Sequence, residues 1–212
     1  MKNYFFDFDG TICESRDIYV VAVQKAFEAR GVRVPTQSEV YNAMGIPIDV
    51  SIAKWAKKGH REDLSKQLFK ESMAEYNAIE DDMVKIFPGI VKTLNELKLA
   101  GKTLFVVSSK THAEVEHNLN NLHLVSLFTD FVGSDEVENH KPAPDEINKL
   151  VKKYDLDVND SIMLGDAKYD MRMGKNAGTK TCACTWGAFD IESLEKEQPT
   201  YTANYPTEIL DL

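Results

Sequence analysis

The sequence predicts an α/β protein built on a Rossmann-like parallel sheet, with helices on both faces of the sheet and an inserted α-helical cap domain. Short apolar runs recur along the chain at intervals too long for β-hairpins, and segments of helical period lie between the later runs. The stretch between the first two runs is far longer than one crossover helix and reads as helical throughout. The first two observations predict the sheet, and the third predicts the insertion.

The predicted strands are the apolar runs themselves, at residues 4–6, 103–107, 128–132, 161–164 and 179–183. Apolar stripes mark two helices between the later strands, one through Val115, Leu119 and Leu122 and the other through Ile147, Leu150, Val151 and Tyr154. Strands that are joined by helices run parallel, because a crossover returns the chain to the same edge of the sheet.

Residues 15–87 form the predicted cap, and residues 1–14 and 88–212 form the α/β core. Apolar stripes in the cap run through Val20, Val23 and Phe27 and through Phe69, Met73 and Tyr76. Turn signals at residues 31–35, 45–47 and 59 divide the cap into about four helices. The chain enters and leaves the cap at residues 14–17 and 81–88, which we expect to act as a paired hinge.

Composition narrows the function classes. The chain has 212 residues, of which 43% are apolar, and a formal net charge of −9. It is predicted to be globular and not to bind nucleic acid, because nucleic-acid binders usually carry a basic patch. No apolar run reaches the length of a membrane span, and the N-terminus reads as a strand and not as a secretion signal. The cysteines are Cys13, Cys182 and Cys184, and the last two read as buried thiols. The protein is predicted to be cytoplasmic, and its oligomeric state stays open.

Polar residues follow the predicted strands at the point where each strand ends. They form the segments 7–11, 108–110, 141–142 and 165–170, which contain acids, hydroxyls and lysines. In an open parallel sheet, ligands bind beyond the carboxyl ends of the strands. We therefore expect these segments to form one site.

Each of these side chains has a chemical use. Asp7 and Asp9 project the same way from an extended segment, and two carboxylates so close are tolerable only if a cation joins them or one holds a proton. Asp166 adds a third hard oxygen ligand, which suits Mg²⁺. Lys141 can neutralise charge on a phosphoryl group, and Ser108 can donate a hydrogen bond to it.

The segments Asp-Phe-Asp-Gly-Thr, Val-Val-Ser-Ser-Lys, Lys-Pro-Ala-Pro-Asp and Gly-Asp-Ala-Lys-Tyr-Asp, in this order, resemble the motifs of the haloacid dehalogenase superfamily. The helical insertion is similar to the cap of its phosphoglycolate-phosphatase-like branch. This resemblance spans the whole chain and implies a magnesium-dependent phosphatase that acts on a small phosphorylated metabolite.

The resemblance also implies residue roles. Asp7 is the expected nucleophile and Asp9 the expected general acid and base. Mg²⁺ is expected on the side chains of Asp7 and Asp166 and the backbone carbonyl of Asp9. Asp170, four residues after Asp166, is expected to belong to the metal site and to act there through water or Lys141. Ser108, Ser109 and Lys141 are expected to grip the phosphate, and Ile48, in the 44–48 turn, to contact the rest of the substrate.

Alternative functions share much of this pattern. A phosphomutase of the β-phosphoglucomutase type usually carries an arginine three residues after a cap glycine, whereas Gly45 is followed by Ile-Pro-Ile. A dehalogenase would not need an acid at Asp9. A non-catalytic regulatory protein on this fold would typically lose a nucleophile or metal ligand. The substrate stays open among phosphoglycolate, sugar phosphates, nucleoside monophosphates and pyrophosphate.

The cap also carries a basic cluster, for which two explanations stay open. Its members are Lys54, Lys57, Lys58, His60 and Arg61. We favour a solvated helix face over a patch that faces the substrate.

Overall fold

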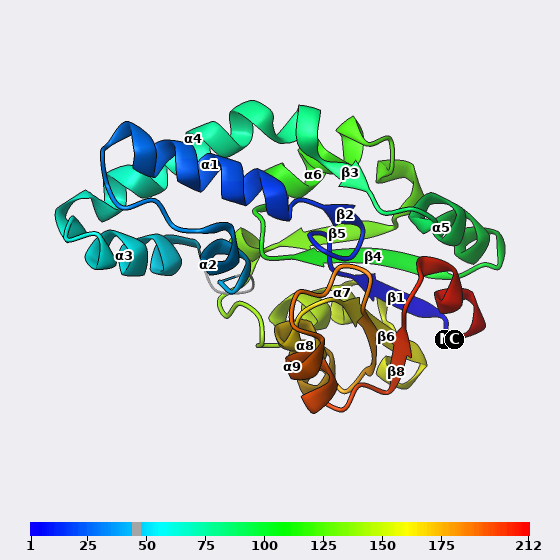
Figure 1. The fold of residues 1–212 in the computed structure, drawn as a ribbon. Coiled ribbons are helices and arrows are strands. Elements are labelled where there is room, and N and C mark those ends of the chain that lie inside the picture. The colour runs from blue at the N-terminus through cyan, green and yellow to red at the C-terminus, as the bar shows by residue number, and fades with distance from the viewer. Residues whose placement is uncertain (44–47) are drawn as a thin grey trace. The chain divides into compact units, whose positions relative to one another are not determined.

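The computed structural model describes residues 1–43 and 48–212. The described chain forms two compact units (Figure 1). The core unit contains Met1–Glu14 and Ile86–Leu212, and the helical unit contains Ser15–Lys85. Two short strands, β2 (Cys13–Glu14) and β3 (Lys85–Ile86), pair where the chain passes from one unit to the other. The expected cap, residues 15–87, extends two residues beyond this helical unit.

The core unit is built on a six-stranded sheet with the order β5-β4-β1-β6-β7-β8. All of its pairings are parallel. The strands are β1 (Asn3–Phe6), β4 (Thr103–Ser108), β5 (Asp130–Gly133), β6 (Ser161–Gly165), β7 (Lys180–Cys184) and β8 (Tyr201–Ala203). The predicted α/β fold class is therefore confirmed, with β8 as a strand that the apolar pattern did not reveal.

Strand β1 lies inside the sheet, and its residues are buried on both faces. Its register places Phe6 beside Val106 of β4 and Leu164 of β6. The carboxyl ends of these strands are therefore level, and the residues that follow them emerge at the same edge of the sheet.

Helices cover both faces of the sheet. Alternate residues of each strand point to opposite faces, so both faces carry buried side chains. On one face, Phe5, Phe105 and Met163 pack against Ile147 of α7 and Met173 of α8. On the other, Phe6 contacts Phe128 edge to face. The helices of the core unit are α5 (Ile90–Leu99), α6 (His112–Asn121), α7 (Asp145–Tyr154), α8 (Lys168–Asn176) and α9 (Ile191–Lys196).

The helical unit contains α1 (Arg16–Ala29), α2 (Gln37–Tyr41), α3 (Ile48–Lys58) and α4 (Ser65–Met83). Its core joins Phe27, Trp55 and Leu68, which are buried. The buried face of α4 runs through Leu68, Ser72, Tyr76 and Glu80. Of the predicted stripe, Tyr76 is buried and Phe69 packs against this core, whereas Met73 is only half-buried. Residues 44–47 of the predicted specificity turn lie outside the described residues.

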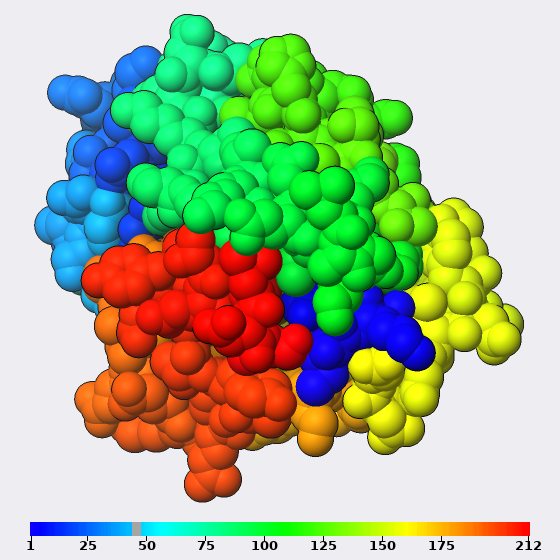
Figure 2. Space-filling model, turned by 90° about the vertical axis from the view of Figure 1, so that its right-hand side faces the viewer, coloured from blue at the N-terminus to red at the C-terminus, as the bar shows by residue number. Residues whose placement is uncertain are grey.

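The two chain ends meet at the amino edge of the sheet. The amino group of Met1 donates to the carbonyl of Leu212 at 3.3 Å, and Lys102 donates to the carbonyl of Met1 at 2.7 Å. Figure 2 shows the first residues, in blue, between the C-terminal segment in red and the segment before β6 in yellow. Lys2 pairs there with Asp160 at 3.4 Å.

The described helices include none that is both long and apolar enough to cross a membrane. All three cysteines are free and buried, which confirms the prediction of buried thiols for Cys182 and Cys184.

Candidate active site

The carboxyl edge of the sheet brings the predicted polar segments together. Asp7 directly follows β1, Ser108 ends β4, and Asp166 directly follows β6. Lys141 comes from the loop that precedes α7, and its peptide bond to Pro142 is cis. These segments are far apart in the sequence and meet because their strands are neighbours.

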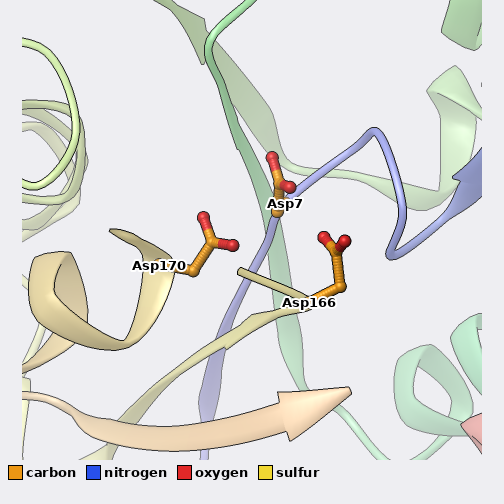
Figure 3. Close-up of side chains that lie close together, drawn as sticks. All are labelled: Asp7, Asp166 and Asp170. Carbon is orange, nitrogen blue, oxygen red and sulfur yellow. The ribbon is translucent and has the colours of Figure 1, made fainter. Parts of the chain in front are cut away.

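An acidic cluster occupies this edge. Asp7, Asp166 and Asp170 each offer a carboxylate oxygen, and these oxygens lie within 4.8 Å of one another. Figure 3 shows the three side chains projecting in the same direction, from the ends of β1 and β6 and from the start of α8. Oδ2 of Asp170 also accepts from the backbone N–H of Ala167 at 3.0 Å, which holds this carboxylate at the first turn of the helix.

Lys141 is held between two of these carboxylates. Its Nζ donates to Oδ1 of Asp7 and to Oδ1 of Asp170, both at 2.8 Å, and to the carbonyl of Val107 at 3.1 Å. The side chain is only 6% exposed. An ammonium carries three N–H donors, so these contacts use all of them and fix the charge in place.

The electrostatics of the cluster favour a bound cation. Burial raises the pKa of Asp7 to about 8, although Lys141 acts in the opposite direction. Burial, together with the charges of Asp7 and Asp170, also raises the pKa of Asp166. Burial alone would lower the pKa of Lys141, but Asp170 and Asp7 outweigh it and raise that pKa above its ordinary value.

Three ionised carboxylates beside one ammonium leave a surplus of negative charge, because only one of the three is balanced. A divalent cation would offset this surplus and return the acids to their ionised forms. Hard carboxylate oxygens are also the ligands that Mg²⁺ prefers. The donor set therefore fits the predicted magnesium ion.

Asp9 lies in a tight turn beside the acidic cluster. The N–H groups of Ile12 and Cys13 donate to the carbonyl of Phe8, and Gly10 has a φ of +82°. A Cβ at Gly10 would lie 2.3 Å from a carboxylate oxygen of Asp166, so only glycine fits there. This turn therefore brings the backbone next to Asp9 against the acidic cluster.

The loop after β7 supports the same turn. Nε1 of Trp186 donates to the carbonyl of Thr11 at 2.9 Å, and the hydroxyl of Thr11 lies 3.4 Å from Oδ1 of Asp166. A Cβ at Gly187 would lie 1.6 Å from the carbonyl oxygen of Gly10. A lone tryptophan such as Trp186 gives no signal of this contact in the sequence.

The remaining predicted contacts lie in different environments. Ser108 is buried, and its hydroxyl accepts from the backbone N–H of Lys110 at 3.2 Å, whereas Ser109 is exposed. Ile48 begins α3 and packs against the core of the helical unit. The predicted catalytic, metal and substrate roles of all these residues remain predictions.

Sequence reasoning assigned no role to Lys110, Asn118 or Glu146. Lys110 and Asn118 are hydrogen-bonded to each other beside Asp9. Glu146 is 1% exposed, and neither of its carboxylate oxygens has a hydrogen-bond partner among the described residues. Burial raises the pKa of Glu146 to about 7. The sequence signal for these buried polar residues was their position next to an apolar stripe, since Asn118 precedes Leu119 and Glu146 precedes Ile147.

Two residues of the basic cluster form salt bridges on the surface of the helical unit. Lys58 pairs with Glu39 at 2.5 Å, and Arg61 pairs with Asp63 at 3.1 Å. The side chains of Lys58 and Arg61 are both exposed, which agrees with the favoured explanation of a solvated helix face.

Comparison with known proteins gives concordant matches. The profile of the family described as haloacid dehalogenase-like hydrolase matches residues 4–184. A Clostridium perfringens protein named "Putative pyrophosphatase PpaX" is 27% identical over 100% of this chain and 97% of its own length. A phosphoglycolate phosphatase of Vibrio parahaemolyticus is 27% identical over 100% of this chain and 96% of its own.

A solved structure of a haloacid dehalogenase-like family hydrolase from Streptococcus pneumoniae is also similar. It superposes with a TM-score of 0.90 at 27% identity, covering 100% of this chain and 97% of the other.

Proposed function

The chain belongs to the haloacid dehalogenase-like hydrolase family, and from this premise we propose that it is a magnesium-dependent phosphatase of small phosphorylated metabolites. The observation that carries the proposal is the placement of Asp7. Its carboxylate lies against the buried ammonium of Lys141 and beside Asp166, with a second acid, Asp9, two residues along the chain. A nucleophile, a fixed cation and a proton donor are thereby available at one edge of the sheet.

In the first step, a carboxylate oxygen of Asp7 attacks phosphorus and the bond to the leaving alcohol breaks. Asp9 donates its proton to that alcohol, and the phosphoryl group is left on Asp7 as an acyl phosphate. Lys141, whose ammonium already contacts Asp7, neutralises negative charge on the transferred phosphoryl group. The buried hydroxyl of Ser108 supplies a further hydrogen bond to the phosphoryl oxygens.

In the second step, water attacks the phosphorus of the acyl phosphate. Asp9, now ionised, accepts a proton from this water, and the bond to Asp7 breaks. The products are inorganic phosphate and a regenerated Asp7 carboxylate. Asp9 returns to its protonated form, ready for the next leaving group.

The residues that would hold Mg²⁺ in this proposal are Asp7 and Asp166, with the backbone carbonyl of Asp9. A bound magnesium ion would supply positive charge that keeps these carboxylates ionised and offsets charge on the phosphoryl group. Both oxygens of Asp170 already accept hydrogen bonds, one from Lys141 and one from the N–H of Ala167. We therefore place Asp170 as the residue that orients Lys141.

For the substrate we propose a phosphoglycolate-like ester, that is, a small phosphorylated acid. The name of the Vibrio parahaemolyticus relative supports this choice. The name of the Clostridium perfringens relative makes pyrophosphate the first competitor to test.

The test is the release of inorganic phosphate by the purified protein, with and without Mg²⁺. A generic aryl phosphate reports the chemistry, and a panel of phosphoglycolate, pyrophosphate, sugar phosphates and nucleoside monophosphates reports the substrate class. We expect hydrolysis that is lost with a chelator and restored by Mg²⁺. Metal-independent hydrolysis, or none with any ester, would refute the proposed function. A higher kcat/KM for pyrophosphate than for phosphoglycolate would refute the substrate assignment alone.

A further inference from the structure

We propose that Lys110 is a positioning residue that orients the carboxylate of Asp9 for proton transfer. The inference rests on the proposed function, because it requires that Asp9 is the general acid and base. Lys110 lies two residues after the end of β4, and its side chain is 5% exposed. Its ammonium lies 3.9 Å from Oδ1 of Asp9.

The ammonium is held in this place by groups around it. Nζ donates to Oδ1 of Asn118 at 3.0 Å, and it lies 5.9 Å from the centre of the Phe8 ring. Asn118 is itself completely buried on α6. A buried ammonium is costly unless it is paired and hydrogen-bonded, so the position beside Asp9 is one that the surrounding contacts stabilise.

The backbone of Lys110 is equally constrained. Its N–H donates to the hydroxyl of Ser108, and its carbonyl accepts from the N–H of Ser134 at 2.8 Å. The helix that carries Asn118 begins with a capping box between Thr111 and Glu114. Both ends of the Lys110–Asn118 contact are therefore attached to regular structure, which gives the ammonium a fixed direction toward the turn that holds Asp9.

A fixed positive charge near Asp9 limits the orientations that its carboxylate adopts. Asp9 is 27% exposed, so part of this side chain faces solvent. General acid catalysis requires the donor within hydrogen-bond distance of the leaving oxygen, and misplacement lowers the rate. Loss of Lys110 should therefore affect the proton transfer that Asp9 performs, and not the binding of the phosphate.

The experiment compares Lys110→Met and Asn118→Leu with wild type on two aryl phosphates, under saturating Mg²⁺. With 4-nitrophenyl phosphate the leaving group needs little acid assistance, whereas with phenyl phosphate it needs much. We expect kcat/KM for phenyl phosphate to fall about tenfold in Lys110→Met, a part of the 10²–10⁴-fold contribution of general acid catalysis. The fall for 4-nitrophenyl phosphate should be clearly smaller. Asn118→Leu should show the same pattern more weakly.

A double-mutant cycle separates positioning from direct binding. If Lys110 acts through Asp9, adding Lys110→Met to Asp9→Asn should cause little further loss. Equal losses on both substrates, or a full additional loss in the double variant, would overturn the proposal. Lys92→Met, an exposed lysine on α5, is the matched control, and thermal unfolding checks that each variant is folded. Absence of wild-type activity with either substrate would instead refute the proposed function itself.

Discussion

Lys141 and Asp170 form a salt bridge of 2.8 Å in which the two side chains are only 6% and 2% exposed. A buried pair of this kind is weak evidence for stability, but breaking it leaves a charge without a partner. The structure also attaches Asp7 to the same ammonium at 2.8 Å. We therefore expect this one lysine to affect both the stability of the protein and the proposed chemistry, and substitutions can separate the two effects.

We expect Lys141→Met to abolish turnover and to destabilise the metal-free protein by about 3–5 kcal/mol, since two buried carboxylates lose their counter-charge. The double variant Lys141→Met/Asp170→Asn should regain a large part of that stability and none of the activity. Urea unfolding and phosphate release measure the two effects. If the double variant is no more stable than Lys141→Met, the unpaired charge of Asp170 is not the cause of the lost stability.

Asp7→Asn should abolish turnover and leave the fold intact, because an amide cannot act as the nucleophile. Burial raises the pKa of Asp7 to about 8 in the metal-free protein. The neutral carboxyl therefore contributes stability that is present below about pH 4 and is lost as the pH rises toward 8. Asn stays neutral, so the metal-free variant should gain stability relative to wild type as the pH rises. Near-normal steady-state activity of a sequence-verified variant would end the proposed mechanism.

Asp9→Asn should behave differently, because the nucleophile stays in place. We expect a loss of about 10²–10⁴-fold in steady-state rate. With a good leaving group the first step needs little acid assistance, so phosphate should accumulate on Asp7. Intact-mass analysis and peptide mapping of quenched reactions locate this phosphate. Phosphate on a different residue would contradict the assignment of both aspartates.

Glu146→Met should stabilise the protein more at pH 8 than at pH 5. Burial raises the pKa of Glu146 to about 7, so the stability of the wild type falls as the pH rises from about 4.5 to about 7. This shift corresponds to on the order of 3 kcal/mol. Glu195→Met, at an exposed position of α9, is the control. A stability difference between Glu146→Met and wild type that does not change with pH would show that the buried carboxyl does not titrate in this range.

Ile48→Arg should change the ranking of substrates more than the intrinsic chemistry. We compare kcat/KM for several phosphate esters with that for a small aryl phosphate. Val50→Arg, an exposed position two residues along the same helix, is the matched control. If every substrate falls by the same factor in Ile48→Arg, the 44–48 turn is not a specificity element.

Much of the fold could be predicted because buried parallel strands are short, continuous apolar runs. The run at 103–107 became β4 (Thr103–Ser108), and the run at 161–164 became β6 (Ser161–Gly165). Strand β8 has only three residues and no such run, and it exists because β7 offers it a free edge. Propensity could not reveal a strand that depends on its neighbour.

The meeting of Asp7, Lys141 and Asp166 was predictable for a similar reason, since the carboxyl ends of neighbouring parallel strands share an edge. The environment of Glu146 and the Lys110–Asn118 contact were not predictable. They depend on how α6 and α7 are rotated about their axes against the sheet, and a rotation by one residue decides which polar side chain is buried. Helix α4 shows the same limit, because Ser72 is buried there while its predicted neighbour Met73 is only half-buried.

The position of β1 between β4 and β6 has a consequence for the synthesis of the chain. This strand is made first, yet its second neighbour ends only at Gly165. At typical translation rates that interval lasts on the order of ten seconds, during which the Tyr-Phe-Phe run has an unpaired edge. A nascent chain stalled or cleaved before Gly165 would therefore expose an aggregation-prone segment. We expect chaperones to bind ribosome-bound chains that end before Gly165 more strongly than longer ones.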